Sequence, residues 1–383
     1  MKNNPTRKSR IFYCFIFLAA LLLAFSMPAA AAETTLPILF VHGNGDSAAL
    51  WYTTFWRFES NGYDPSLLFA IDFRHPTARM DDTRPQENRS GTADQARELA
   101  AKITEIQART GQKQLILVGS SRGGNAIRNY VKNFGGAPNV ARAVLCGTPN
   151  HGVQANPENL NNEFNGSGPF LSGLNAGEEV VPGVQFMTTR SDSNDKYAQP
   201  DGRFLGNPGK PTNVTYSGPE LRGAKNVVLP WLDHREVAFH AKAFSAIYPF
   251  VAGGEPKTLD IIPQPRPVLN GMVSGFANGA PSNIPISGAT MEIHRINPLS
   301  GEREGGLVHK KTISGDGLWG PFTAHPEAHY EFVVTAEGYP ITHNYRPPFP
   351  RSSPYIHFRL KPLSEREKGS GSLITLSRPR GYL

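Results

Sequence analysis

The segment Gly119-Ser120-Ser121-Arg122-Gly123 has the pattern G-x-S-x-G and is the strongest indication of the fold in this sequence. The apolar run 115–118 before it predicts a buried strand, and residues 125–131 after it predict a helix. A serine on a tight turn between a strand and a helix is presented as a nucleophile, and small neighbours let the backbone bend. The sequence therefore predicts a nucleophilic Ser121; the alternative is a loop serine that only caps the helix.

The first 32 residues are predicted to be a signal peptide that is removed on export. Residues 11–25 form a short apolar run, and Ala30-Ala31-Ala32 offers a cleavage site before Glu33. An uncleaved anchor is the alternative, but the run is short and its end is rich in alanine. We expect a secreted or periplasmic protein with no stable membrane anchor. Four basic residues precede the apolar run: Lys2, Arg7, Lys8 and Arg10.

Charge and cysteine content change once this leader is removed. The formal net charge of +7 includes the four basic residues of the leader and would fall to +3 without them. The basic character therefore gives little support for a nucleic-acid partner, and none is expected. Cys14 leaves with the leader, so the mature chain is predicted to have no internal disulfide. Cys146 is expected to be a small buried side chain.

Strands and helices alternate from residue 36 to about residue 254, which predicts an α/β fold with a mostly parallel sheet. We assign residues 33–256 to this catalytic domain. Thr92 and Gln95 are interpreted as the capping box of a helix over 92–109. The loop 150–182 is unusually long, so it either partly covers the site as a lid or is a plain insertion. The strands are expected at 37–41, 67–71, 115–118, 143–146, 183–188 and 226–230, and the last helix at 240–251.

A second, all-β domain is predicted after a proline-rich linker at 257–267. Short β-type runs recur between turn signals, which is typical of a small sandwich, here residues 268–362. Residues 363–383 are expected to be a flexible tail. The segments 312–319 and 330–339 resemble transthyretin-like or carboxypeptidase-regulatory-like modules. The expected strands lie at 268–276, 289–296, 308–313, 330–336 and 355–360.

A serine hydroxyl becomes a good nucleophile when a histidine takes its proton and a carboxylate orients that histidine. In folds that carry this serine turn, the acid and then the histidine follow the serine along the chain. His234 stands between the last predicted strand and the last helix, where the base is needed. His240 is the alternative. His151 lies too close after the serine motif and is interpreted as a loop residue.

The acid is expected in the loop that follows the strand 183–188. Asp195 is preferred to Asp192, because a side chain leaving the strand needs a few residues before it can turn back toward the histidine. Asp233 is a poor candidate because a residue adjacent to His234 points away from its ring.

The negative oxygen of a tetrahedral intermediate needs two backbone N–H donors that are already in place. One is expected from Arg122, the residue after the nucleophile. The turn His42-Gly43-Asn44-Gly45 follows the first core strand and is expected to supply the other, from Asn44. The alternative for this segment is a simple turn.

Together these segments resemble the small bacterial class 2 lipases over most of residues 36–254. The resemblance implies an α/β-hydrolase fold, hydrolysis of carboxylic esters through an acyl-enzyme, and no metal or organic cofactor. It assigns the triad to Ser121, Asp195 and His234, with Asn44 and Arg122 at the oxyanion hole. That family more often has His and Met where Ser120 and Arg122 stand, and we expect the Arg122 side chain to favour polar or anionic substrates. The matching segments are 41–45, 119–124, 147–152, 191–195 and 223–234.

The expected substrate is a small-molecule or lipid ester, and a polymeric ester is the alternative. In the polymer hypothesis the sandwich binds an insoluble polyester through exposed aromatic side chains. Those candidates, which could equally be core residues, are Trp319, Tyr339, Tyr345 and Phe349. A second aromatic group either lines an acyl pocket or packs in the core: Trp51, Tyr52, Phe55 and Trp56.

Two further functional classes receive little support from the sequence. A catalytically inactive adhesion or scaffold module is less expected, because every member of a triad can be assigned. A metal site is not expected, because the segment from His234 to His240 does not read H-E-x-x-H. No glycine loop with the G-x-x-x-x-G-K pattern of phosphate binding occurs either.

Overall fold

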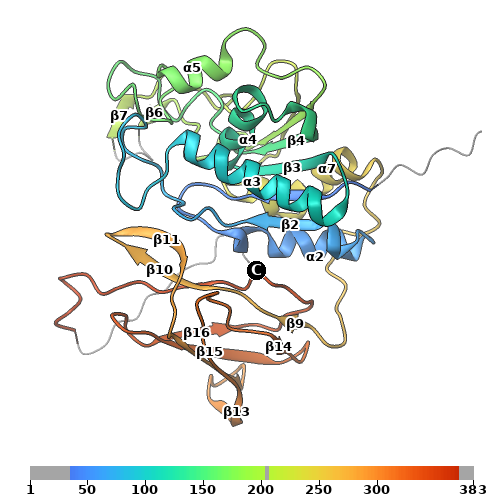
Figure 1. Cartoon of the computed structure of the whole chain (residues 1–383), viewed down its shortest axis with the longest axis vertical. Coiled ribbons are helices and arrows are strands. Elements are labelled where there is room, and N and C mark those ends of the chain that lie inside the picture. The colour runs from blue at the N-terminus through green and yellow to red at the C-terminus, as the bar shows by residue number, and fades with distance from the viewer. Residues whose placement is uncertain (1–34, 203–206, 371–383) are drawn as a thin grey trace, which may run out of the picture. The chain divides into compact units, whose positions relative to one another are not determined.

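The computed structural model describes residues 35–202 and 207–370, shown in Figure 1. The predicted signal peptide lies outside the described residues, as does most of the predicted tail. The described residues from Leu36 onward belong to one compact unit. No helix among them is both long enough and apolar enough to cross a membrane.

A parallel sheet at the centre of the first part confirms the predicted α/β fold. Six strands of the described chain pair in parallel in the order β2-β1-β3-β4-β5-β8. Each expected strand occurs within a few residues of its predicted bounds. The strands are β1 (Ile38–Val41), β2 (Leu68–Ile71), β3 (Leu115–Ser120), β4 (Val140–Cys146), β5 (Gln185–Arg190) and β8 (Lys225–Val228).

Alternation along the strands builds two cores, one on each face of this sheet. In β1, Ile38 and Phe40 enter one core while Leu39 and Val41 enter the other. Because successive strand residues point to opposite faces, a strand covered on both faces must be apolar throughout. Figure 1 shows helices on both faces of the sheet. Cys146 is fully buried in the first core, as expected, and burial raises the pKa of its thiol to about 12.

Helices α3 and α4 supply apolar side chains to one core, and α2, α6 and α7 supply them to the other. The long helices begin and end near their predicted bounds. Their bounds are η1 (Ala48–Trp51), α2 (Tyr52–Ser60), η2 (Pro65–Leu67), α3 (Thr92–Thr110), α4 (Arg122–Asn133), η3 (Ala137–Asn139), α6 (Glu236–Phe239) and α7 (Ala241–Ala252).

The start of α3 corrects the predicted capping box. Gly91, not Thr92, is the N-cap residue, and the Asp94 carboxylate accepts from the Gly91 N–H at 2.8 Å. Thr92 lies inside the helix and donates its hydroxyl to Asp82 at 2.6 Å, while Gln95 is buried. Thr92 and Gln95 fit the pattern S/T-x-x-E/Q of a capping box. Because the Thr92 hydroxyl binds Asp82 instead of the helix N-terminus, the N-cap is one residue earlier, at Gly91.

The loop 150–182 contains one short helix, α5 (Pro169–Asn175), and a two-stranded ribbon follows β5. The ribbon consists of β6 (Asp201–Gly202) and β7 (Asn207–Pro211), which pair antiparallel. These segments extend the chain between β4 and β8 without adding strands to the central sheet.

The C-terminal part consists of small sheets around one hydrophobic core, which confirms the predicted all-β character. Over the described residues, β13-β12-β15-β16 form an antiparallel sheet. A second sheet has the order β11-β10-β17, in which β10 pairs antiparallel with β11 and parallel with β17. Their bounds are β9 (Val268–Leu269), β10 (Val273–Ala277), β11 (Ala280–Pro285), β12 (Thr290–Ile296), β13 (Arg303–Thr312), β14 (Phe322–Thr323), β15 (His329–Thr335), β16 (Thr342–Arg346) and β17 (Phe358–Arg359).

The aromatic residues of η1 and α2 pack in cores, which corrects the acyl-pocket alternative. Trp51 and Phe55 contact Phe40 under the sheet, and both are almost fully buried. Tyr52 and Trp56 belong to the core of the C-terminal part, and the Trp56 indole donates to the Ser352 carbonyl at 2.8 Å. The apolar side chains of α2 thus pack against both the central sheet and the C-terminal part, so they do not line a pocket.

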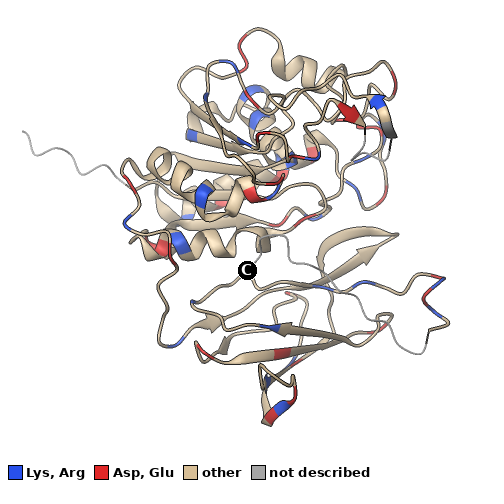
Figure 2. Cartoon of the chain, turned by 180° about the vertical axis from the view of Figure 1, so that it is seen from behind, with Lys and Arg blue, Asp and Glu red and all other residues tan. Residues whose placement is uncertain are grey.

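Figure 2 shows acidic and basic residues interspersed along both parts of the chain.

The segment predicted to be a linker, residues 257–267, is bound to α2. Thr258 exchanges two hydrogen bonds with the Asn61 side chain, and the Ile262 N–H donates to Ser60.

Candidate active site

Ser121 occupies the turn between β3 and α4, in a backbone conformation that few residues adopt. Its φ is +53° and its ψ is −122°, a region sparsely populated by non-glycine residues. The Ser121 N–H donates to the Cys146 carbonyl at 2.8 Å, which ties the turn to the end of β4. The strained residue is thus fixed at the carboxyl edge of the sheet.

The glycines around Ser121 let backbone segments approach closely. A Cβ on Gly123 would lie 2.5 Å from the Val41 carbonyl oxygen, and one on Gly124 would lie 1.9 Å from Thr148 Oγ1. Any side chain at these positions would push α4 away from β1 and β4. This is the physical reason that the motif needs glycine after the serine.

Ser121, His234 and Asp195 form a continuous hydrogen-bonded series. The Ser121 hydroxyl donates to His234 Nε2 at 2.9 Å, and His234 Nδ1–H donates to Asp195 Oδ1 at 2.8 Å. Asp195 and His234 are buried, with side chains 4 % and 8 % exposed. A carboxylate on Nδ1 fixes the tautomer that leaves Nε2 free to accept a proton from the serine.

Asp195 and His234 are themselves held by neighbouring groups. Asp195 Oδ1 also accepts from the Tyr197 N–H at 2.8 Å, and the Gln199 amide donates to the Asp195 carbonyl at 2.9 Å. The Tyr197 ring packs edge-on against the His234 ring, with centroids 4.6 Å apart. These contacts limit rotation of both side chains.

The rejected candidates have other partners. Asp192 accepts from the N–H groups of Ser193 and Trp231, so it braces its own loop and the loop that leads to His234. Asp233 accepts from the N–H groups of Arg235 and Glu236 at the start of α6. His240 is the N-cap of α7, where its Nδ1 accepts from the Lys242 N–H.

The turn 42–46 lies directly against the serine. A Cβ on Gly43 would sit 3.1 Å from Ser121 Cβ, so a glycine here allows contact between the two turns. The His42 ring, which is buried, donates from Nδ1 to the Gly43 carbonyl and accepts from the Phe73 N–H at Nε2. Burial lowers the pKa of His42, which keeps this ring neutral.

Asn44 and Arg122, the predicted oxyanion donors, lie in the turn after β1 and at the start of α4. Asn44 follows Gly43 in the turn, and its side-chain oxygen accepts from the Ala78 N–H at 2.8 Å. Arg122 is the first residue of α4, and the first N–H groups of a helix have no partner within the helix. Both backbone amides therefore belong to segments adjacent to Ser121.

The Arg122 side chain is fully buried, which overturns the expectation that it favours polar or anionic substrates. Its Nε lies 2.5 Å from the Glu163 carboxylate, and its terminal nitrogens donate to the Pro76 carbonyl and to Ser90. Burial raises the pKa of Glu163 to about 7, although the guanidinium opposes this shift. The guanidinium binds the segment 76–90 and the loop 150–182, and its burial keeps it away from a substrate.

Comparison with known families agrees with this architecture. Residues 37–203 match the family model described as the alpha/beta hydrolase fold, and residues 268–363 match the model described as the lipase C-terminal domain. The first segment is therefore similar to proteins of the α/β-hydrolase fold. Hereafter we call residues 36–256 the hydrolase domain and residues 268–363 the C-terminal domain.

Individual relatives are more distant. A non-heme haloperoxidase from Rhodococcus erythropolis is 30% identical over 172 residues, which cover 39% of this chain and 57% of that protein. Among solved structures, the mature form of Bacillus licheniformis lipase BlEst2 is similar, with a TM-score of 0.42, 21% identity and coverage of 57% of this chain and 93% of that one. Aspergillus fumigatus lipase B has a TM-score of 0.42 and 15% identity, covering 61% of this chain and 57% of its own.

Sequence reasoning missed Gly147 and Tyr197. Gly147 follows β4 in the hydrolase domain with φ +55°, and a Cβ there would lie 2.8 Å from the His234 carbonyl oxygen. The signal was present in the segment Gly147-Thr148-Pro149, where a glycine directly follows a buried strand. Nothing in the sequence around Tyr197 indicates its contact with His234, because that contact joins two separate loops.

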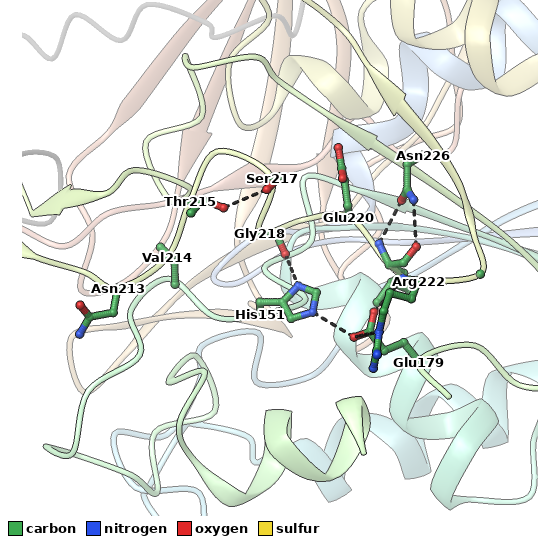
Figure 3. Close-up of a pocket in the computed structure, with 12 residues that line it drawn as sticks. His151, Glu179, Asn213, Val214, Thr215, Ser217, Gly218, Glu220, Arg222 and Asn226 are labelled. Carbon is green, nitrogen blue, oxygen red and sulfur yellow. Dashed lines mark hydrogen bonds and ion pairs between the residues drawn. The ribbon is translucent and has the colours of Figure 1, made fainter. Parts of the chain in front are cut away.

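A hollow of about 440 Å³ lies elsewhere on the hydrolase domain, between the loops that follow β4 and precede β8 (Figure 3). His151 donates from Nδ1 to the Gly218 carbonyl at 2.8 Å, and its Nε2 lies 3.3 Å from Glu179. Glu179 also accepts from the N–H and the Nε of Arg222. The lining does not include Ser121, Asp195 or His234, and His151 connects the loop after β4 to Gly218 and Glu179.

No group of three or more His, Cys, Asp or Glu side chains that could hold a metal ion occurs in residues 35–202 and 207–370.

Proposed function

We propose that this protein is a serine hydrolase that cleaves carboxylic esters through an acyl-enzyme on Ser121. The observation that carries the proposal is the pair of contacts from Ser121 Oγ to His234 Nε2 at 2.9 Å and from His234 Nδ1 to Asp195 Oδ1 at 2.8 Å. The hydrolase-fold match over residues 37–203 and the lipase C-terminal domain match over 268–363 support it.

In the first half-reaction, Ser121 Oγ attacks the ester carbonyl carbon while His234 Nε2 takes the hydroxyl proton. The carbonyl oxygen becomes negative in the tetrahedral intermediate and accepts from the N–H groups of Asn44 and Arg122. His234 then gives the proton to the leaving alkoxide, which departs as the alcohol. Asp195 stabilises the imidazolium that exists between these two transfers.

In the second half-reaction, a water molecule attacks the acyl-enzyme and His234 takes one of its protons. A second tetrahedral intermediate collapses, the bond to Ser121 Oγ breaks, and His234 returns the proton to the serine. The products are the carboxylic acid and the free enzyme. No cofactor is required for this sequence.

Hydrolysis of p-nitrophenyl acetate, butyrate, octanoate and palmitate by residues 33–383 tests the proposal. Ser121→Ala is expected to abolish turnover, and Ser120→Ala is the matched control because Ser120 is the preceding serine but is buried in β3. The dependence on chain length separates an esterase from a lipase. Equal activity of wild type and Ser121→Ala would refute the assignment of the nucleophile.

Polymer binding by the C-terminal domain receives weaker support than hydrolysis of small or lipid esters. Of the four aromatic residues considered for that role, Trp319 and Phe349 are buried in the core of the domain, and Tyr339 is partly buried. Tyr345 alone of the four is largely exposed, at 59%. Binding of the intact protein to polyester particles, compared with Tyr345→Ala, tests what remains of this alternative.

Perhydrolysis is a second candidate reaction, favoured by the similarity to the non-heme haloperoxidase. Hydrogen peroxide in place of water would attack the acyl-enzyme and release a peracid, which oxidises bromide. Bromide oxidation in acetate and hydrogen peroxide, lost in Ser121→Ala, would support it.

We also propose that residues 1–32 direct export and are then removed. The basic start, the apolar run and the alanine-rich end support this assignment. Expression of the full sequence in a bacterium, followed by N-terminal mass analysis of the exported protein, tests it. An intact N-terminus retained in the membrane fraction would favour an anchor instead.

A further inference from the structure

Two side chains of the C-terminal domain bind the turn that carries Asn44. Arg359, in β17, donates from Nη1 to the Gly45 carbonyl at 2.6 Å and from Nη2 to the Asp46 carbonyl at 3.0 Å. These carbonyls belong to the two residues that directly follow Asn44. A planar guanidinium can bind two neighbouring acceptors at once and thereby fixes their orientation.

Asn283, in β11, completes the attachment. Its Nδ2 donates to the carbonyls of Asp46 and Phe73, each at 3.0 Å, and its Oδ1 accepts from Arg359 Nη2. Asn283 is buried, with 5% of its surface exposed. The pair therefore connects the turn after β1 to the segment after β2 through a buried asparagine and a partly buried arginine.

The opposite side of the turn is fixed within the hydrolase domain. Gly43 packs against Ser121, and the Gly45 N–H donates to the Pro76 carbonyl at 3.0 Å. Asn44 stands between these two glycines. A segment with two glycines has wide backbone freedom, so the direction of its central N–H depends on such external contacts.

We propose that Arg359 and Asn283 are positioning residues for the oxyanion hole. They act through the carbonyls of Gly45 and Asp46, which fix the turn and direct the Asn44 N–H toward the developing oxyanion. The C-terminal domain thus contributes to stabilisation of the transition state in addition to any contact with substrate. The inference rests on the proposed function, because it assumes that Ser121 forms a tetrahedral intermediate.

Arg351 provides a matched control for Arg359. It is also an arginine of the C-terminal domain that binds the hydrolase domain, with its side chain 11% exposed. It donates to Glu59 in α2 at 2.8 Å and to the Ile262 carbonyl at 2.7 Å, and neither group belongs to the turn. Arg351→Met and Arg359→Met therefore remove similar links between the domains, but only the second releases the turn.

The experiment measures kcat and KM for p-nitrophenyl butyrate on residues 33–383 carrying each substitution. Arg359→Met is expected to lower kcat by about 10- to 100-fold, since loss of a complete oxyanion donor costs about 100- to 1,000-fold. KM should change little, because the oxyanion contact forms only in the transition state. Arg359→Lys should recover part of the loss, since an ammonium can reach one carbonyl, and Arg351→Met should keep the wild-type kcat.

Hydrogen exchange of the backbone amides over residues 42–48 supplies a readout that does not depend on turnover. Arg359→Met should speed exchange in this segment, whereas Arg351→Met should not. The inference is overturned if kcat of Arg359→Met equals that of Arg351→Met, or if exchange in the turn is the same in both. A different result refutes the proposed function itself: wild type that hydrolyses no ester, or Ser121→Ala that retains activity. The inference about catalysis would then fail as well. The exchange rates would still show whether Arg359 holds the turn 42–48.

Discussion

Glu163 lies 2.5 Å from Arg122, and both side chains are buried. This ion pair joins the loop after β4 to the residue that follows the proposed nucleophile. The sequence predicts either a lid or a plain insertion here, but this contact and the hydrogen bond from the Asp82 N–H to the Asn161 carbonyl tie the loop to the segment 76–90. The loop therefore contributes to the support of the turn that carries Ser121.

Arg122→Met should destabilise the protein strongly, because the buried Glu163 must then stay charged without its partner or take up a proton, and Pro76 and Ser90 lose their hydrogen bonds. Removal of one member of a buried ion pair typically costs about 3–5 kcal/mol of the free energy of unfolding. In a Glu163→Gln background the same substitution should cost at least about 1 kcal/mol less, since neighbouring groups are coupled.

Urea unfolding of the two single variants and the double variant measures this coupling. Arg84→Met is the control, because Arg84 is 84% exposed and pairs with Asp81 at 3.6 Å on the surface. Exposed pairs contribute about 0–1 kcal/mol. A cost for Arg122→Met no larger than that for Arg84→Met would contradict the role of the buried pair.

Asp195→Asn is expected to reduce kcat by roughly four orders of magnitude, because an amide facing His234 Nδ1 favours the wrong imidazole tautomer. Asp192→Asn should leave kcat within a few-fold of wild type, since Asp192 binds backbone N–H groups in its own and the neighbouring loop. Steady-state kinetics on p-nitrophenyl butyrate distinguishes them. A larger loss in Asp192→Asn would reverse the assignment of the acid.

Gly147→Ala should impair catalysis as well as stability. A non-glycine residue at φ +55° costs about 1–2 kcal/mol, and the new methyl group would lie 2.8 Å from the His234 carbonyl oxygen. Displacement of the base by a fraction of an ångström should lower kcat by about tenfold or more.

Gly177→Ala is the control for this effect. Gly177 has a similar φ of +69°, but an added Cβ there has no atom of the described structure within 4 Å. Both variants should lose stability in urea, Gly147→Ala the more because of its added contact with the His234 carbonyl oxygen, and only Gly147→Ala should lose kcat. Equal kcat values would show that contact with His234 is unimportant.

Asp72 should make the free energy of unfolding depend on pH in the acidic range. Burial acts to raise its pKa, but the His357 ring and further donors outweigh burial and lower the pKa from 3.8 to about 2. A carboxyl group whose pKa is lower in the folded state stabilises the fold above its unfolded pKa. That contribution, about 2 kcal/mol, disappears as the pH falls from about 4 toward 2.

Urea unfolding of wild type and Asp72→Asn at pH 6 and pH 3 measures this contribution. Wild type should be the more stable at pH 6, and the difference should be smaller at pH 3. Asp260→Asn, at an exposed aspartate, should show no such trend. A difference that stays constant with pH would mean that the charge of Asp72 is not its origin.

Much of the hydrolase domain could be predicted from local sequence patterns. The apolar strand β1 and the apolar residues 115–118 of β3 indicate a sheet covered on both faces, and the glycines after Ser121 indicate a helix packed closely on it. The helix cap at Gly91 could not be predicted, because Thr92 is drawn to Asp82, a residue ten positions away. The burial of the aromatic residues of α2 could not be predicted either, since their spacing in the sequence is compatible with a pocket lining and with a core.

The sequence by itself determined the α/β architecture, the serine turn and the order of the candidate acid and base, because strand alternation and turn chemistry are local properties. Only the tertiary structure decided that Asp195 rather than Asp192 meets His234, across 39 residues, and that His234 meets Ser121, across 113. It also decided that the Arg122 guanidinium turns inward to Glu163 and that Arg359 reaches the turn beside Asn44. Such contacts depend on which segments the packed cores bring together, and short-range periodicity carries no information about that choice.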